Sequence, residues 1–214
     1  AFVAMANDDR LDALWFARGG YGSGRIIGDV LPRLTVAARA KTYLGYSDEG
    51  FVLGSLYRAG FPHLAHGSMV ADIKRAGGDA AVRRSLAWLA CADSAALAPE
   101  IDVDTPTVAF NLTILSMMIG TDMLPDLKGH ILCVEEVCEY DYATDRVLSH
   151  VGAALKNAGL AGLRLGEVSD VPVNDRPFGD TPEDMARRVC AANGIPYLGR
   201  VSIGHTPRNH VVPF

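Results

Sequence analysis

The stretch that decides the fold is residues 40–60, AKTYLGYSDEGFVLGSLYRAG. Residues 41–46 are rich in β-branched and aromatic side chains, which favours a short strand. After Ser47 the apolar residues recur at helical spacing, and Gly60 ends the helix that this spacing predicts. Ser47 therefore lies at a tight strand-to-helix corner. Such a corner exposes a hydroxyl at the sheet edge and aims the following N–H groups at whatever that hydroxyl attacks.

The residues around Ser47 leave two interpretations open. Gly45 precedes the serine by two positions and Gly50 follows it by three, which is one residue longer than the G-x-S-x-G pattern of hydrolytic serines. The same spacing is equally compatible with a serine that only caps the following helix. The corner by itself therefore indicates either a nucleophile or a helix cap.

Composition narrows the class of protein. The chain has 214 residues, of which 49% are hydrophobic and 21% charged, as in ordinary globular proteins. Its net charge of −5 argues against a surface for nucleic acid or anionic membranes. The four cysteines show no CxxC pair, which favours reduced thiols, and no apolar run reaches the length of a membrane span.

A glycine-rich stretch, RGGYGSGR at residues 18–25, follows a short apolar run at 12–17 that predicts a buried strand. The stretch lacks both the GK[ST] ending of a P-loop and the third glycine of G-x-G-x-x-G. Glycines allow a sharp turn or a close backbone approach. The stretch therefore predicts either a loop that donates an N–H to an oxyanion or a tight turn without a ligand.

The remainder of the chain alternates strands and helices. Residues 92–107 contain two prolines and no sustained apolar run, which indicates a linker between lobes. Beyond it, residues 129–134 predict a buried strand that ends at two carboxylates, Glu135 and Glu136, and Thr144 is expected to cap the next helix. Residues 195–203 predict a last long strand that leads to His205. The first six residues resemble the tail of a helix, so we expect a longer natural chain.

Three side chains suit a catalytic set. A hydroxyl needs a base to become a nucleophile, and the base needs a partner that fixes its tautomer. Ser47 supplies the hydroxyl, His205 follows a glycine just past a strand, and Glu135 ends an apolar strand. A salt bridge for Glu135 and a loop hydrogen bond for His205 are the alternatives. His63 and His66 lack the spacing and the third ligand of a metal site, so we expect structural histidines and no metal.

The series of motifs along the chain is similar to that of the LD-carboxypeptidases, the serine peptidase family S66, which includes the microcin C immunity peptidases. The motifs are RGGYGSGR, LGYSD, HGSM, NLTILSMMIGT, ILCVEEVCEYDYATDR and IGHTPRNHVVPF. The resemblance implies an α/β fold with a flavodoxin- or Rossmann-like first lobe, mostly parallel in its sheet, and a second α/β lobe. We place the first lobe at residues 1–91, the linker at 92–107 and the second lobe at 108–214. The active site is expected between the lobes.

The resemblance also assigns roles. It implies that Ser47 is the nucleophile, Glu135 the orienting carboxylate and His205 the base, with the backbone N–H groups of Gly20 and Asp48 forming the oxyanion hole. No cofactor is implied. The chain departs from the family pattern at Glu49-Gly50 after GYSD, at Ser68 where HGP is common, and at Ala109-Phe110 where GGN is common. These changes flank the pocket and bear on substrate choice.

Three functions follow as hypotheses. The leading one is a cytoplasmic LD-carboxypeptidase that removes D-alanine from murein tetrapeptides during cell-wall recycling, with a homodimer as the family's usual state. The second is an immunity peptidase that cleaves aminoacyl-nucleotides. The third, from another class, is a catalytically silent module that uses the glycine loop to bind a nucleotide or sugar phosphate.

Overall fold

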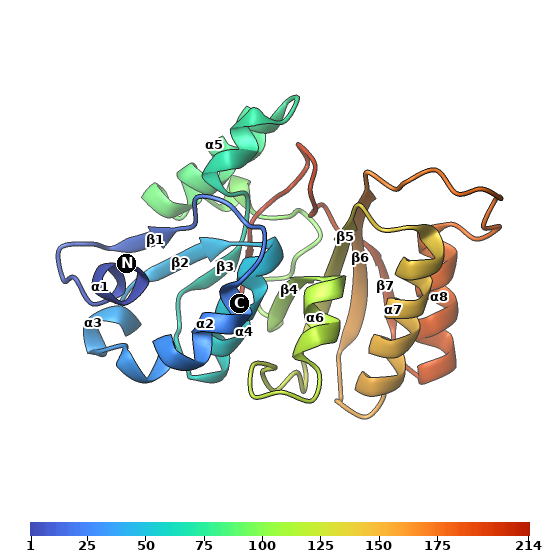
Figure 1. Cartoon of the computed structure of the whole chain (residues 1–214), viewed down its shortest axis with the longest axis horizontal. Helices are drawn as coiled ribbons and strands as arrows, with labels where there is room; N and C mark the ends of the chain where they lie inside the picture. Colours follow the sequence, from blue (N-terminus) through green and yellow to red (C-terminus); the bar gives the residue numbers. More distant parts are fainter.

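A computed structural model describes all residues, 1–214, and contains two β-sheets side by side, each with its own helices (Figure 1). The first sheet has the strand order β1-β2-β3-β8, in which the first three strands are parallel and the last is antiparallel. The second sheet has the order β4-β5-β6-β7 and is parallel throughout. The expected α/β class, with a mostly parallel first sheet and a second α/β lobe, is confirmed.

The strands are short, as their apolar runs predict. Those of the first sheet are β1 (Ala13–Trp15), β2 (Thr42–Gly45), β3 (Leu64–His66) and β8 (Val212–Pro213). Those of the second are β4 (Thr107–Asn111), β5 (Ile131–Val137), β6 (Gly162–Ser169) and β7 (Tyr197–Arg200). β4 and most of β5 are buried at every position, as expected for parallel strands covered on both faces.

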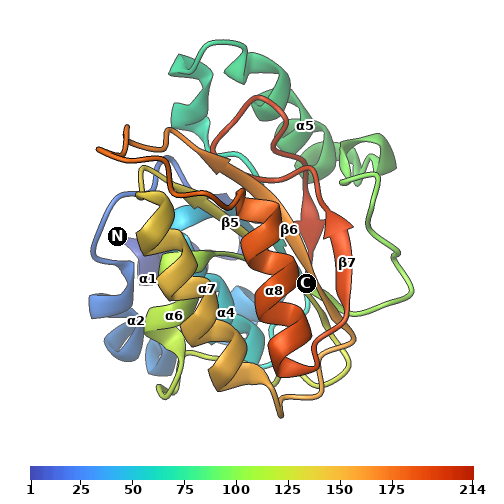
Figure 2. The same ribbon diagram turned by 90° about the vertical axis from the view of Figure 1, so that its right-hand side faces the viewer.

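The helices divide between the sheets. The first sheet carries α1 (Phe2–Ala6), α2 (Ser23–Val30), α3 (Val36–Arg39), α4 (Gly50–Arg58), α5 (Gly78–Cys91) and the short 3₁₀ turns η1 (Leu31–Arg33), η2 (Ser47–Glu49), η3 (Val70–Lys74) and η4 (Ser94–Ala96). The second carries α6 (Leu112–Met118), α7 (Asp141–Leu155) and α8 (Pro182–Asn193), which lie together in front of its strands in Figure 2. None of these helices is both long and apolar enough to cross a bilayer.

Two local expectations were wrong. Thr144 does not cap α7 but is buried inside it, because the chain turns at Cys138 with φ +60° and the helix begins at Asp141. The last long strand is shorter than residues 195–203: β7 spans only Tyr197–Arg200, and Gly199 within it has φ +86°, which makes even this short strand irregular.

The two sheets share packing at the C-terminal end of the chain. After crossing back to pair with β3, the chain places the ring of Phe214 edge-on against Tyr57, with ring centroids 5.8 Å apart, and against Phe110, at 5.4 Å. Phe214 packs against the apolar cores of both sheets. The last residues therefore join the sheet that carries Ser47, although the sequence places them in the second lobe. The boundaries at 91 and 108 stay a prediction.

Candidate active site

The corner at Ser47 is a strained piece of backbone at the end of β2. Ser47 has φ +61°, the left-handed region that a non-glycine residue enters at a cost of about 1–3 kcal/mol. Its neighbour Gly45 is required by packing, since a Cβ there would lie 2.7 Å from the ring of Phe16. Gly19 of the glycine loop passes so close that a Cβ on it would lie 3.2 Å from the Ser47 hydroxyl oxygen. The corner therefore holds a half-buried serine beneath a loop in which the position of Gly19 leaves little room for a side chain.

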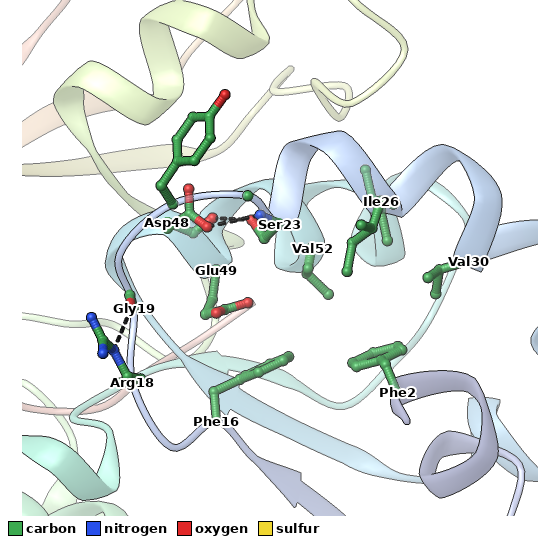
Figure 3. A pocket seen from close by; sticks show the side chains of 13 residues that line it. Phe2, Phe16, Arg18, Gly19, Ser23, Ile26, Val30, Asp48, Glu49 and Val52 are labelled. Carbon is green, nitrogen blue, oxygen red and sulfur yellow. Dashed lines mark hydrogen bonds between the residues drawn. The ribbon is translucent and has the colours of Figure 1, made fainter.

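Asp48 ties the glycine loop to this corner. Its carboxylate accepts the backbone N–H of Ser23 at 2.9 Å, and its carbonyl accepts the Ser23 hydroxyl at 2.5 Å (Figure 3). Ser23 is the first residue of α2, so the buried carboxylate also faces the positive end of that helix. Gly20 has φ +134°, and its N–H donates no backbone hydrogen bond. The loop thus holds an unused amide close to Ser47.

Glu135 and His205 form the other half of the site. Glu135 is fully buried in β5, and its Oε2 accepts a hydrogen bond from Nδ1 of His205 at 2.7 Å. The pairing of β5 with β6 shifts register between Val134 and Glu136, an irregularity of the kind that re-aims a side chain. Because the Nδ1 proton is held by the carboxylate, a neutral His205 keeps a free lone pair on Nε2, as a general base requires.

The neighbouring carboxylate has a different task. Glu136 accepts hydrogen bonds from the side-chain amide of Asn111, from the N–H and hydroxyl of Thr113, and from the N–H of Val137. Burial raises the pKa of Glu136, and these donors oppose the rise. Glu136 thus fixes the start of α6 to β5. By contrast, Oε1 of Glu135 has no partner.

A cavity of about 250 Å³ brings the two halves together. Ser47, Gly19, Gly20 and His205 all line it, although Ser47 and His205 come from opposite ends of the chain. The ring of Tyr46 forms one wall, with its centroid 4.6 Å from that of His205. Of the predicted site residues, Ser47, Gly20 and His205 thus meet in one cavity. Glu135 lies behind His205, and Asp48 directly follows Ser47.

Sequence reasoning missed a second polar group at this cavity. The hydroxyl of Tyr46 donates to Asp72 at 2.9 Å, and Arg75 lies 3.3 Å from the same carboxylate. Burial and then the charge of Asp72 raise the pKa of Tyr46. Tyr46 stands in the GYSD motif, but Asp72 and Arg75 belong to a polar stretch with no recognisable spacing. Only the fold identifies them.

His63 and His66 differ in their burial. His66 is buried and Nε2 lies 3.0 Å from Oδ1 of Asn209, which also accepts the N–H of Gly204. Burial lowers the pKa of His66 to about 4. His66 is thus held inside the protein by a buried hydrogen bond, whereas His63 is exposed. No group of three or more His, Cys, Asp or Glu side chains is arranged to hold a metal ion.

Comparison with known proteins identifies the family. The N-terminal domain of LD-carboxypeptidases matches residues 1–67, and their C-terminal domain matches residues 105–214. The chain belongs to the LD-carboxypeptidase family S66. Members of this family are peptidases, and the chain is accordingly an LD-carboxypeptidase-like hydrolase.

Individual relatives agree with this assignment. The murein tetrapeptide carboxypeptidase of Pseudomonas aeruginosa is 25% identical over 219 residues, which cover 95% of this chain and 70% of that protein. The muramoyltetrapeptide carboxypeptidase structure from Oxalobacter formigenes has a TM-score of 0.78 at 24% identity, covering 99% of this chain and 75% of the other. MccF in complex with glutamyl sulfamoyl guanosine has a TM-score of 0.79 at 16% identity, covering 100% of this chain and 74% of the other. At such identities the two structures are similar to this chain in fold alone.

Proposed function

We propose that this S66 chain is a serine peptidase that releases a C-terminal D-amino acid from a murein tetrapeptide, with Ser47, His205 and Glu135 as its catalytic residues. The observation that supports it best is the buried hydrogen bond from His205 to Glu135 beside a cavity that Ser47 also lines. Acyl transfer needs a nucleophile, a base and a group that orients the base, and these three residues are of the types that supply them.

The reaction proceeds in two halves. Nε2 of His205 takes the proton of the Ser47 hydroxyl while Oγ bonds to the scissile carbonyl carbon, and the carbonyl oxygen becomes an oxyanion. The N–H groups of Gly20 and Asp48 donate to that oxyanion. The C–N bond then breaks, His205 returns the proton to the leaving amine, and water hydrolyses the acyl-enzyme with His205 again as base.

The substrate follows from the relatives' names and from the family resemblance. The Pseudomonas aeruginosa relative is a murein tetrapeptide carboxypeptidase. We propose the bond between the L-centre of diaminopimelate or lysine and the terminal D-alanine, cleaved during cytoplasmic recycling of cell-wall peptides. A homodimer belongs to the same proposal.

A second candidate is hydrolysis of an aminoacyl-nucleotide. Tyr21, in the glycine loop, has 85% of its surface exposed and lines a separate cavity of about 450 Å³ beside Gly20 and Asp48. An exposed aromatic ring is a platform on which a nucleobase can stack. This observation favours the second candidate, because an enzyme that cleaves an aminoacyl-nucleotide needs a surface for the base.

The deciding experiment measures two products: D-alanine released from a murein tetrapeptide, and the amino acid released from an aminoacyl-nucleotide analogue whose phosphate link is replaced by a stable group. Labelling by a fluorophosphonate is measured alongside. We expect the wild-type protein to release D-alanine and to be labelled, and Ser47→Ala to do neither. Release from the nucleotide analogue alone would favour the second candidate. Identical behaviour of wild type and Ser47→Ala with both substrates would overturn both.

A further inference from the structure

The cavity at Ser47 carries positive charge in a chain whose net charge is −5. Two guanidinium groups, Arg18 and Arg75, line it, and its one carboxylate is Asp72. That carboxylate is buried and already accepts from the Tyr46 hydroxyl, the N–H of Met69 and Arg75. The side chains around Ser47 therefore leave a cationic surface for a ligand.

Both arginines keep donor capacity toward the cavity. Arg18 is exposed and makes no ion pair, and its Nε donates to the carbonyl of Gly19 at 3.1 Å (Figure 3). Arg75 donates to the carbonyl of His205 at 3.1 Å and lies 3.6 Å from Asp170, whose side chain is 60% exposed. An exposed pair of this kind is worth about 0–1 kcal/mol, so an incoming carboxylate can replace it. Guanidinium groups have five donors and suit carboxylates in a bidentate geometry.

A second cavity along the glycine loop is chemically different. This cavity of about 450 Å³, which Gly20 also lines, is formed largely by apolar side chains, among them Phe51, Ile114 and Met117, with Arg25 and Asp48 as its charged groups. Gly20 thus lines both the cavity that holds the two arginines and a larger, mostly apolar cavity. At about 250 Å³, the cavity that Arg18 and Arg75 line is smaller than the ~300–1,000 Å³ usual for drug-sized ligands, and its size suits one small residue.

We propose that Arg18 and Arg75 bind the free carboxylate of the C-terminal amino acid that leaves, so that the cavity at Ser47 is the leaving-group subsite. The acyl part of the substrate then extends past Gly20 into the apolar cavity. This inference rests on the proposed function, since it assumes that the bond broken lies next to a terminal carboxylate. Selection of the C-terminal residue would then depend on the charge of its carboxylate, because an internal peptide bond or an amidated end offers these arginines no anion.

The test measures binding to Ser47→Ala protein, which requires no turnover. The probes are a tetrapeptide that ends in D-alanine and the same peptide with a D-alanine amide end, so that only the terminal charge differs. Calorimetry should show the free acid bound more tightly by roughly tenfold to a hundredfold, as hydrogen bonds to a charged group imply. Arg75→Gln and Arg18→Gln, each in the Ser47→Ala background, should reduce this preference.

A matched control is Arg83→Gln, because Arg83 lies on α5, is 81% exposed and faces Asp79. It should leave the preference intact. Equal binding of acid and amide by the Ser47→Ala protein would overturn the subsite. So would an unchanged preference in both Arg18→Gln and Arg75→Gln. If the preference holds but wild-type protein releases no D-alanine, the proposed function fails and the carboxylate subsite stands.

Discussion

The two halves of the site are built by different means. The first lobe holds its part through backbone conformation: Ser47 has φ +61°, Gly20 has φ +134°, and Gly19 is pressed against the serine. The second lobe holds its part through buried side-chain hydrogen bonds, with Glu135 on His205 and Glu136 on the start of α6. A nucleophile and its oxyanion donors need a fixed backbone, whereas a base needs a partner that fixes its protons.

The largest effect should come from breaking the second-lobe pair. Glu135→Gln keeps the size of the side chain but replaces the carboxylate with a neutral amide, whose NH2 group can face Nδ1 of His205 and favour the wrong tautomer. We expect kcat for D-alanine release to fall by about 10⁴-fold, as when the orienting carboxylate of a serine protease triad is replaced by its amide. Circular dichroism and thermal unfolding should show a folded protein. A loss below tenfold would mean that Glu135 does not orient the base.

The next effect tests the backbone of the first lobe. Gly20→Ala forces a Cβ into a φ of +134° and should displace the N–H that we propose as an oxyanion donor. Loss of one such donor lowers kcat by roughly a hundredfold to a thousandfold.

Gly22→Ala is the matched control for Gly20→Ala. It has a similar φ, +120°, and a Cβ there meets no atom within 4 Å. The two variants should therefore lose similar stability but differ in kcat. Equal loss of kcat in both would show that Gly20 only shapes the loop.

A smaller effect separates the two carboxylates of β5. Glu136→Ala leaves the buried amide of Asn111 and the hydroxyl of Thr113 without their acceptor. We expect the free energy of unfolding to fall by about 2–3 kcal/mol in urea titrations. The remaining folded protein should retain far more activity than Glu135→Gln. Stability equal to wild type would contradict the structural task assigned to Glu136.

The smallest effect concerns Glu49, which lines a third cavity, of about 470 Å³, and lies between Asp48 and Phe16 in Figure 3. Burial, followed by the Asp48 charge, raises the pKa of Glu49 from 4.5 to about 7. The folded state then binds more protons than the unfolded state between these values, so stability should fall as pH rises from about 4.5 to 7.

Glu49→Gln should remove this dependence. In thermal or urea unfolding, we expect the variant to gain on the order of 1–3 kcal/mol over wild type at pH 8 and nothing at pH 4. The same gain at both pH values would show that Glu49 does not titrate in this range.

The sequence by itself determined the local elements and part of the site. Residue types and apolar patterns predicted the segments that form β2, α4 and β5. The glycine-rich stretch predicted a sharp turn or a close backbone approach, and Gly19 does pass close to Ser47. These features are visible because each depends on residues a few positions apart.

Which polar side chains lie together at the site follows only from the tertiary structure. Glu135 and His205 are 70 positions apart, and Tyr46, Asp72 and Arg75 meet only where β2 and the turn after β3 approach. The return of β8 to the first sheet likewise could not be predicted from the sequence, since a strand of two residues is too short to show an alternating apolar pattern. Side-chain hydrogen bonds between distant segments impose no spacing along a chain, so only the folded backbone reveals which charges face the serine.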